Sequence, residues 1–268
     1  MKRTSLLRTA IFLLFFSVML LSGWKLYGIY AEYTEGTKTY DTIASQYVTV
    51  PSPVLETSEE NTPVATPPPS VSFEALQAEC SDVVAWLYCE GTPINYPIVQ
   101  GEDNDYYLHR LINGSYNISG TLFMDFQNQP DFSDWNTIIY GHNMNNDSMF
   151  GILPDYMNQS FYDDHPVMYL LTPTQDFKIE LISGYVTPAT SNTYSIPATQ
   201  EERDAILNKA YTSSNFISNV SVSAEEKLVT LSTCVYDYDN ARYVLVGVLR
   251  ELDLDSQEGV AQNTGSQE

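Results

Sequence analysis

Basic residues are scarce in this chain. Only 12 of the 268 residues are Lys or Arg, against 34 Asp or Glu. Four of the 12 lie within the first 25 positions, which leaves eight for the remainder. Such an acidic chain repels nucleic-acid phosphates, and it has no basic stripe to overcome that repulsion. We therefore exclude nucleic acid as a partner.

Cysteine is equally rare, with Cys80, Cys89 and Cys234 as the three examples. An odd count excludes a fully paired disulfide scaffold and leaves at least one free thiol. Cys80 shares an apolar helical stripe with Phe73 and Leu76, and Cys89 ends the β-like run VVAWLYC. We expect both to be packing residues, although a bridge between them stays open. Cys234 is left for chemistry.

Metal-ligand and phosphate-binding motifs are also missing. The three histidines, His109, His142 and His165, form no H-x-x-x-H pair, and no C-x-x-C occurs. Neither a Gly-rich phosphate loop nor a G-x-S-x-G motif is present. The sequence therefore predicts no metal site and no cofactor.

A long charge-free run is confined to the N-terminus. The run Thr9–Trp24 follows the basic segment MKRTSLLR, and LYGIYAEY extends it beyond Lys25, whose side chain can snorkel. A membrane span needs about 20 residues. We expect residues 1–30 to be a signal-anchor, with a cleaved signal peptide as the alternative. The positive-inside rule places residues 31 onward outside the membrane.

Beyond the anchor we expect three regions. Residues 31–71, rich in Thr and Pro, predict a semi-extended spacer that holds a domain away from the membrane. Residues 72–252 form the domain, and residues 253–268 are a polar, disordered tail. Strand patterns appear in VVAWLYC, INYPIVQ, TLFMDF, NTIIYG, VMYLLT, FKIELISGYVT, KLVTLSTC and YVLVGVLR. This pattern predicts a mainly β fold, a barrel or sandwich.

Three helices accompany the strands: the first begins the domain, and the other two interrupt the strand pattern. One is expected at about 72–80 and another in DSMFGILPDYM, residues 147–157. The third begins after Thr199, whose spacing to Glu202 is that of a capping box, and runs to about Tyr211.

The stretch TLSTCVYDYDNAR places Cys234 at the end of one predicted strand and Arg242 at the start of the next. If the two strands pair antiparallel, Arg242 returns beside Cys234. A guanidinium there favours a thiolate or binds an oxyanion, both useful for acyl transfer. His142 ends another strong strand and is the candidate partner of the nucleophile. An inert cysteine with a surface arginine stays open as the plain alternative.

The other two histidines carry less signal. We expect His109, in YYLHR, to be a packing or surface residue, and His165 to be solvated in a polar turn.

The ordered segments of residues 72–250 resemble sortases, the cell-wall cysteine transpeptidases of Gram-positive bacteria, and class B in particular. The resemblance rests on TLSTC with the downstream arginine, and on INYPIVQGEDNDYYL, GTLFMDFQN, NTIIYGHNM, SMFG and QSFYDDHP. It implies an eight-stranded β-barrel with an N-terminal helix and a further helix between strands six and seven.

The resemblance also implies roles for particular residues. Cys234 matches the nucleophile, His142 the catalytic histidine and Arg242 the oxyanion-binding arginine. The residues that match the substrate groove are Ser232, Thr193, Tyr194 and Ser195. The implied reaction is cleavage of a C-terminal sorting signal after Thr through a Cys thioester. Transfer to an amine of a peptidoglycan precursor or cross-bridge completes it, so the partners are secreted proteins that carry such a signal.

Other functions are alternatives, and one is a housekeeping sortase with many wall-protein substrates, against which the class B pattern argues. A pilin-polymerising sortase often has a lid with an Asp-Pro-aromatic motif, which residues 51–70 lack. A non-enzymatic adhesion domain on a Pro-rich stalk would not need Cys234, His142 and Arg242 to converge. A papain-like protease is disfavoured because the cysteine follows the histidine and no Asn or Asp partner segment is evident.

Overall fold

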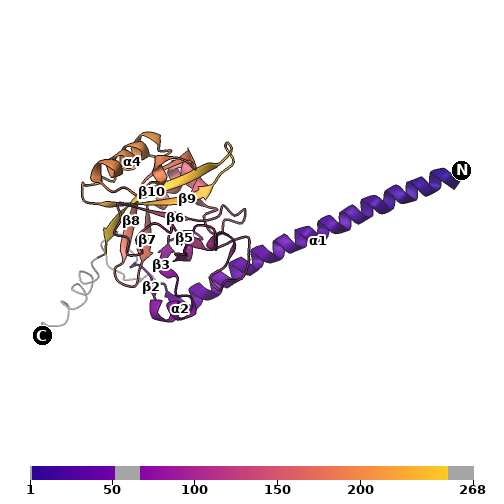
Figure 1. Cartoon of the computed structure of the whole chain (residues 1–268), viewed down its shortest axis with the longest axis horizontal. Helices are drawn as coiled ribbons and strands as arrows, with labels where there is room; N and C mark the ends of the chain where they lie inside the picture. The colour runs from indigo at the N-terminus through magenta and orange to yellow at the C-terminus, as the bar shows by residue number, and fades with distance from the viewer. Residues whose placement is uncertain (1, 52–66, 253–268) are drawn as a thin grey trace, which may run out of the picture.

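Eight strands close into one barrel in the computed structural model, which describes residues 2–51 and 67–252. They are β3 (Val83–Tyr88), β4 (Asn95–Val99), β5 (Leu122–Met124), β6 (Asn136–Tyr140), β7 (Val167–Leu171), β8 (Phe177–Pro188), β9 (Lys227–Cys234) and β10 (Ala241–Glu251). Their order around the barrel is β10-β8-β7-β3-β4-β5-β6-β9. Every one of the eight predicted strands is present, so the expected mainly β barrel is confirmed (Figure 1).

The apolar run of β10 shows why the sequence pattern predicts these strands so clearly. Tyr243 and Leu245 face the barrel interior, while Val244 and Val246 pack on the outside under α4 (Gln200–Ser213). Burial on both faces requires apolar residues at successive positions, in place of simple alternation. The helix α4 therefore covers the outer face of β8 and β10, between the sixth and seventh barrel strands as expected.

The start of α4 follows the predicted capping box. The Thr199 side chain accepts a hydrogen bond from the Glu202 backbone N–H at 3.3 Å. The Glu202 carboxylate reaches back to the N–H of Ala198, at 2.8 Å, one position before the expected target. The first bond satisfies a backbone donor that the first helical turn leaves free, and the second holds the chain just ahead of the helix.

The helix expected at residues 147–157 is wrong in part. Only the end of that segment is helical, as the 3₁₀ turn η2 (Leu153–Met157), and α3 (Gln159–Asp164) follows it. Asp147 and Met149 have positive φ angles of 62° and 54°, which no right-handed helix accommodates. Two further 3₁₀ turns, η1 (Tyr107–His109) and η3 (Asn192–Tyr194), border the site described below.

The N-terminal region differs from the expected spacer. A single helix, α1 (Lys2–Tyr47), contains the apolar run and continues without a break to the barrel (Figure 1). Residues 31–47, predicted to be semi-extended, are helical, and Tyr40 and Tyr47 on them are buried in the core. Short strands β1 (Val48–Thr49) and β2 (Ser70–Val71) then pair ahead of α2 (Phe73–Glu79), the helix expected at 72–80. Of the expected spacer, residues 52–66 lie outside the described part of the chain, as does the expected tail from residue 253.

Within the described residues, α1 is the one helix long and apolar enough to cross a membrane. The qualifying segment is Arg8–Tyr47, judged by length and composition.

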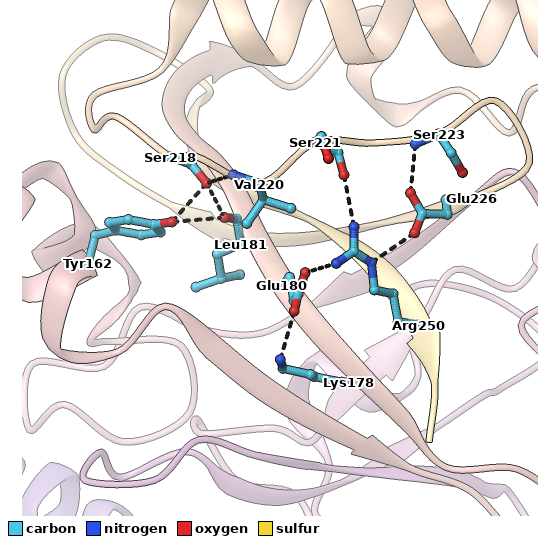
Figure 2. Close-up of polar contacts among 10 residues, drawn as sticks. All are labelled: Tyr162, Lys178, Glu180, Leu181, Ser218, Val220, Ser221, Ser223, Glu226 and Arg250. Carbon is cyan, nitrogen blue, oxygen red and sulfur yellow. Dashed lines mark hydrogen bonds and ion pairs between the residues drawn. The ribbon is translucent and has the colours of Figure 1, made fainter. Parts of the chain in front are cut away.

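A charged cluster ties down the segment 214–226 that joins α4 to β9 (Figure 2). Arg250, near the end of β10, pairs with Glu180 of β8 and, at 2.8 Å, with Glu226. The guanidinium also donates to the Ser221 carbonyl at 2.8 Å. Figure 2 shows Lys178 completing the cluster from below, 2.7 Å from Glu180. The cluster fixes the end of the barrel opposite to Arg242.

Candidate active site

The pairing of β9 with β10 places Cys234 directly opposite Arg242. The two strands form an antiparallel hairpin, and these residues are its last pair before the 235–240 loop. Both side chains are half-buried, so the thiol and the guanidinium are reachable from solvent. The predicted return of Arg242 beside Cys234 is confirmed.

His142 reaches the same place through a different strand pair. The strand β6 runs parallel to β9, with Tyr140 opposite Ser232. The Gly141 N–H donates to the Ser232 carbonyl at 3.1 Å, which continues the pairing past the end of β6. A Cβ at Gly141 would lie 2.4 Å from Leu122, so only glycine allows this approach. His142 therefore follows β6 at the level where Cys234 ends β9.

A second contact holds the strand ends together. The Asn143 amide donates to the Cys234 carbonyl at 2.8 Å, and the Thr233 hydroxyl donates to the Gly141 carbonyl, also at 2.8 Å. The backbone of the candidate nucleophile is thus bonded to the residue after the candidate histidine. Such cross-links keep a catalytic pair in register.

The imidazole of His142 is fixed by residues 108 and 109. Its Nε2 lies 2.7 Å from the Leu108 carbonyl, which can only accept, so Nε2 donates. The His109 ring stacks on it with the ring centroids 5.4 Å apart. Burial lowers the pKa of His142, the Leu108 carbonyl opposes this, and the charge of His109 lowers the pKa further. The imidazolium form of His142 is therefore confined to a lower pH range than that of a free histidine.

These groups border one cavity of about 310 Å³. Its lining comprises Asn104, Leu108, Phe123, Tyr140, Gly141, His142, Ala189, Tyr194, Ser232, Thr233, Cys234 and Arg242. The aromatic rings make much of the wall apolar, and the three candidate catalytic groups are among its polar members. An apolar pocket with a few convergent polar groups is typical of a ligand site.

Tyr194 and Ser232, both predicted to border the substrate groove, lie on this wall and bond to each other. Their hydroxyl oxygens are 2.8 Å apart. Burial raises the pKa of Tyr194 to about 12, while the bond to Ser232 and the charge of Arg242 oppose the rise. The phenol is therefore neutral at ordinary pH and serves as a hydrogen-bonding group.

The other two predicted groove residues lie behind the cavity. Thr193 is fully buried, and its hydroxyl bonds to Tyr185 at 2.9 Å. Ser195 is exposed and bonds to the Asn192 carbonyl at 2.6 Å. The Asn136 amide donates to the carbonyls of both Thr193 and Ser195, at 3.1 Å in each case. These positions favour a role in supporting the wall over contact with a ligand.

Several site residues were not singled out from the sequence. His109 is a surface residue, as expected, and its exposed ring also covers His142. Tyr140 stacks on Tyr194 and donates to the Asp125 carboxylate at 2.9 Å. Asn104 holds the same carboxylate at 3.0 Å. Asn104 belongs to the segment INYPIVQGEDNDYYL, on which the resemblance partly rests, and His109 follows that segment directly, which was the available signal.

The remaining chemistry-bearing residues lie elsewhere. Cys80, Cys89 and Cys234 are all free thiols, so the bridge left open between the first two is not formed. Cys89 is buried as expected, whereas Cys80 is half-buried, 3.7 Å from the Tyr107 hydroxyl. His165 is half-buried and packs on Phe161 with the ring centroids 4.5 Å apart.

A family model described as a sortase domain matches residues 87–250. Sortase B of Listeria monocytogenes is 34% identical over 255 residues, which cover 93% of this chain and 99% of that protein. The chain belongs to the sortase family. Sortases are cysteine transpeptidases, so the predicted enzyme class is confirmed.

Other relatives place this sortase in class B. Sortase B of Staphylococcus aureus is 33% identical over 178 residues, 65% of this chain and 72% of that protein. A solved structure of sortase B from Bacillus anthracis is 32% identical with a TM-score of 0.69, covering 84% of this chain and all of that one. The sortase B structure from Clostridium perfringens gives 0.63 at 32% identity, covering 68% of this chain and all of that one.

Proposed function

We propose that this sortase is anchored in the membrane by α1 and cleaves a C-terminal sorting signal after Thr. The protein upstream of the cut is then joined to an amine of a peptidoglycan precursor or cross-bridge. The observation that carries the proposal is the convergence of His142, Cys234 and Arg242 on one cavity. The apolar, exposed residues of α1 support the anchor, with residues 31 onward outside the cell.

The first half-reaction breaks the peptide bond after Thr. The Cys234 thiolate attacks the Thr carbonyl carbon, and Arg242 stabilises the negative charge that develops on the carbonyl oxygen. The carbon–nitrogen bond then breaks, and the His142 imidazolium gives its proton to the leaving amine. A thioester between Cys234 and Thr remains.

The second half-reaction resolves the thioester. An acceptor amine attacks the Thr carbonyl carbon, and Arg242 again faces the oxyanion. The carbon–sulfur bond breaks, Cys234 leaves as the thiolate, and His142 takes up the proton of the attacking amine. A new amide bond is formed and the enzyme returns to its starting state.

The cavity suits an extended peptide bearing Thr at the cleavage site. Tyr194 and Ser232 offer hydroxyl groups beside Cys234, and the Tyr140 and Phe123 rings offer apolar surface. Thr193 and Ser195 act on the peptide through the wall that they support.

The test uses the full chain and a library of candidate pentapeptides. Cys234→Ala should abolish cleavage of every peptide while thermal unfolding is unchanged. Arg242→Lys should cut kcat/KM severely, because a point charge cannot reproduce the donor geometry of a guanidinium. Mass spectrometry should detect the acyl-enzyme formed on Cys234. Cleavage that persists in Cys234→Ala would refute the thioester mechanism, and normal rates in Arg242→Lys would refute the oxyanion role.

A further inference from the structure

The apolar part of α1 leads into the barrel with no spacer between them. Phe12, Leu14 and Trp24 are 67%, 63% and 74% exposed, as residues of a membrane span would be in the absence of lipid. Further along the same helix, Gly36 and Tyr40 are buried against the barrel. Within one continuous helix, the side chains thus change from exposed and apolar to packed against the barrel.

The length of helix between the two surfaces is short. A helix rises about 1.5 Å per residue, so the eight residues from Trp24 to Glu32 span about 12 Å. The headgroup layer on each side of the bilayer core is about 5–8 Å thick. Tyr27 and Tyr30, both exposed, fall in this interval and suit the interface between lipid and water. The first contact of α1 with the domain therefore occurs at, or just above, the headgroups.

The segment that meets α1 at this level is the loop of residues 106–117, here called the interface loop. The Asn117 amide donates to the Glu32 carbonyl at 3.0 Å. Ser119 lies two residues after Asn117, and a Cβ on Gly36 would lie 2.6 Å from its hydroxyl. The backbone of α1 therefore approaches this segment closely. The Tyr40 hydroxyl donates to the Gly120 carbonyl at 2.7 Å. The first contact belongs to the interface loop and the other two to the residues just after it, so together they fix the height of the loop on the helix.

The interface loop presents side chains that suit a lipid headgroup layer. Tyr116 is 64% exposed and Tyr106 46% exposed. The guanidinium of Arg110 lies 4.9 Å above the Tyr106 ring, and none of the described carboxylates pairs with it. Tyrosine rings favour the membrane interface, and arginine binds phosphate.

We propose that the interface loop rests on the outer headgroup layer of the membrane that α1 spans. Tyr106 and Tyr116 lie at the interface, and Arg110 faces lipid phosphates. This inference rests on the membrane anchoring put forward under Proposed function.

The contact brings the catalytic cavity close to the membrane surface. The Tyr116 ring is 5.9 Å from that of His109, which is 5.4 Å from that of His142. Figure 1 shows the loop between β9 and β10, next to Cys234, on the side of the barrel toward which α1 leaves. Substrates are then met within the layer next to the bilayer, where a secreted chain emerges.

The opposite end of the barrel provides a matched control. Ile217 is 77% exposed and lies in the segment held by the Arg250 cluster of Figure 2. Arg250 is eight residues from Arg242 along β10, which corresponds to about 26 Å. A probe at Ile217 is therefore held away from the bilayer if the proposed orientation is correct.

The experiment places the full chain in nanodiscs of phosphatidylcholine and phosphatidylglycerol brominated near the headgroup end of the acyl chains. Tyr116→Trp should add emission that bromine quenches, beyond the wild-type signal of Trp24, Trp86 and Trp135. Ile217→Trp should add emission that bromine leaves intact. Equal quenching of both variants, or none for Tyr116→Trp, would overturn the orientation.

Two additions separate this outcome from other failures. Tyr106→Trp repeats the measurement in case Tyr116→Trp does not fold, which circular dichroism would show. Cys234→Ala combined with Tyr116→Trp removes thioester chemistry but should keep the same quenching. In Tyr116→Trp with Cys234 intact, lost cleavage with intact quenching refutes only the proposed reaction, whereas normal cleavage with no quenching refutes only the membrane contact.

Discussion

At the residue scale, the site depends on how one imidazole is held. His142 donates to the Leu108 carbonyl and stacks on His109, so adjacent residues fix both the edge and the face of its ring. The same contacts act on its charge, because burial and His109 both disfavour the imidazolium. The proposed mechanism needs that imidazolium to protonate the leaving amine. If the proposed mechanism holds, the pH range of activity should therefore depend on His109.

We predict that His109→Phe raises the pKa of His142. Phenylalanine keeps a ring to stack on His142 but removes the like charge that lowers its pKa. The imidazolium then persists to higher pH, so the alkaline limb of the cleavage rate should move upward with it. NMR titration of the imidazole C2 protons measures the pKa, and only three histidines contribute signals.

His165→Gln is the control, since that ring packs on Phe161 away from the cavity. It should leave the pKa of His142 unchanged. An unchanged or lower pKa in His109→Phe would mean that the stacking ring does not act through its charge.

At the element scale, α4 is held by a buried arginine. Arg203 is 1% exposed, and its guanidinium donates to the carbonyls of Ser223 and Glu226 at 2.8 and 2.5 Å. It also pairs with Asp204 at 2.7 Å. Through Glu226 this helix is linked to Arg250, so one network joins α4, the segment 214–226 and β10. The network fixes the start of β9, the strand that ends at Cys234.

We predict that Arg203→Met lowers the free energy of unfolding by about 1–3 kcal/mol, the usual cost of buried polar groups left without partners. Methionine approximates the length of the side chain but leaves the Ser223 and Glu226 carbonyls without their donor. Urea denaturation measures the change. Glu201→Gln, an exposed position on the same helix, should alter stability little. Equal stability of the two variants would contradict a structural role for the buried guanidinium.

At the scale of the whole molecule, α1 belongs to two environments. Its N-terminal part is exposed and apolar, while Tyr40, Ile43 and Tyr47 are part of the main core. The helix is therefore a structural part of the catalytic domain as well as the proposed anchor. A fragment that begins after the apolar run keeps the packed half of α1, whereas a fragment that begins after the whole helix loses it.

We predict that a fragment of residues 32–252 is more stable than one of residues 48–252. The shorter fragment exposes the core surface that Tyr40, Ile43 and Tyr47 cover. Burial of a large apolar side chain contributes about 1.5–3 kcal/mol. The midpoint of thermal unfolding of the shorter fragment should therefore be several degrees lower. Calorimetry of both fragments measures this. Identical midpoints would show that the packed half of α1 is dispensable to the barrel.

The sequence by itself determined the barrel strands and the hairpin that pairs Cys234 with Arg242. Strand patterns are local, and a short loop between two strong strands allows few pairings. The sequence signal for α4 was equally local, because Thr199 and Glu202 mark its start within one turn. The helix predicted over residues 147–157 was wrong in part for the converse reason. Its positive φ angles follow from packing, which local helix propensity does not predict.

Only the tertiary structure decided what surrounds these residues. His109 lies 33 positions before His142 in the sequence, and no local pattern predicts that their rings stack. Likewise, the polar composition of residues 31–47 indicated a spacer, but burial of a few tyrosines and an isoleucine outweighs it. Contacts between distant segments depend on the closed barrel and the docked helix, and those exist only once the whole chain has folded.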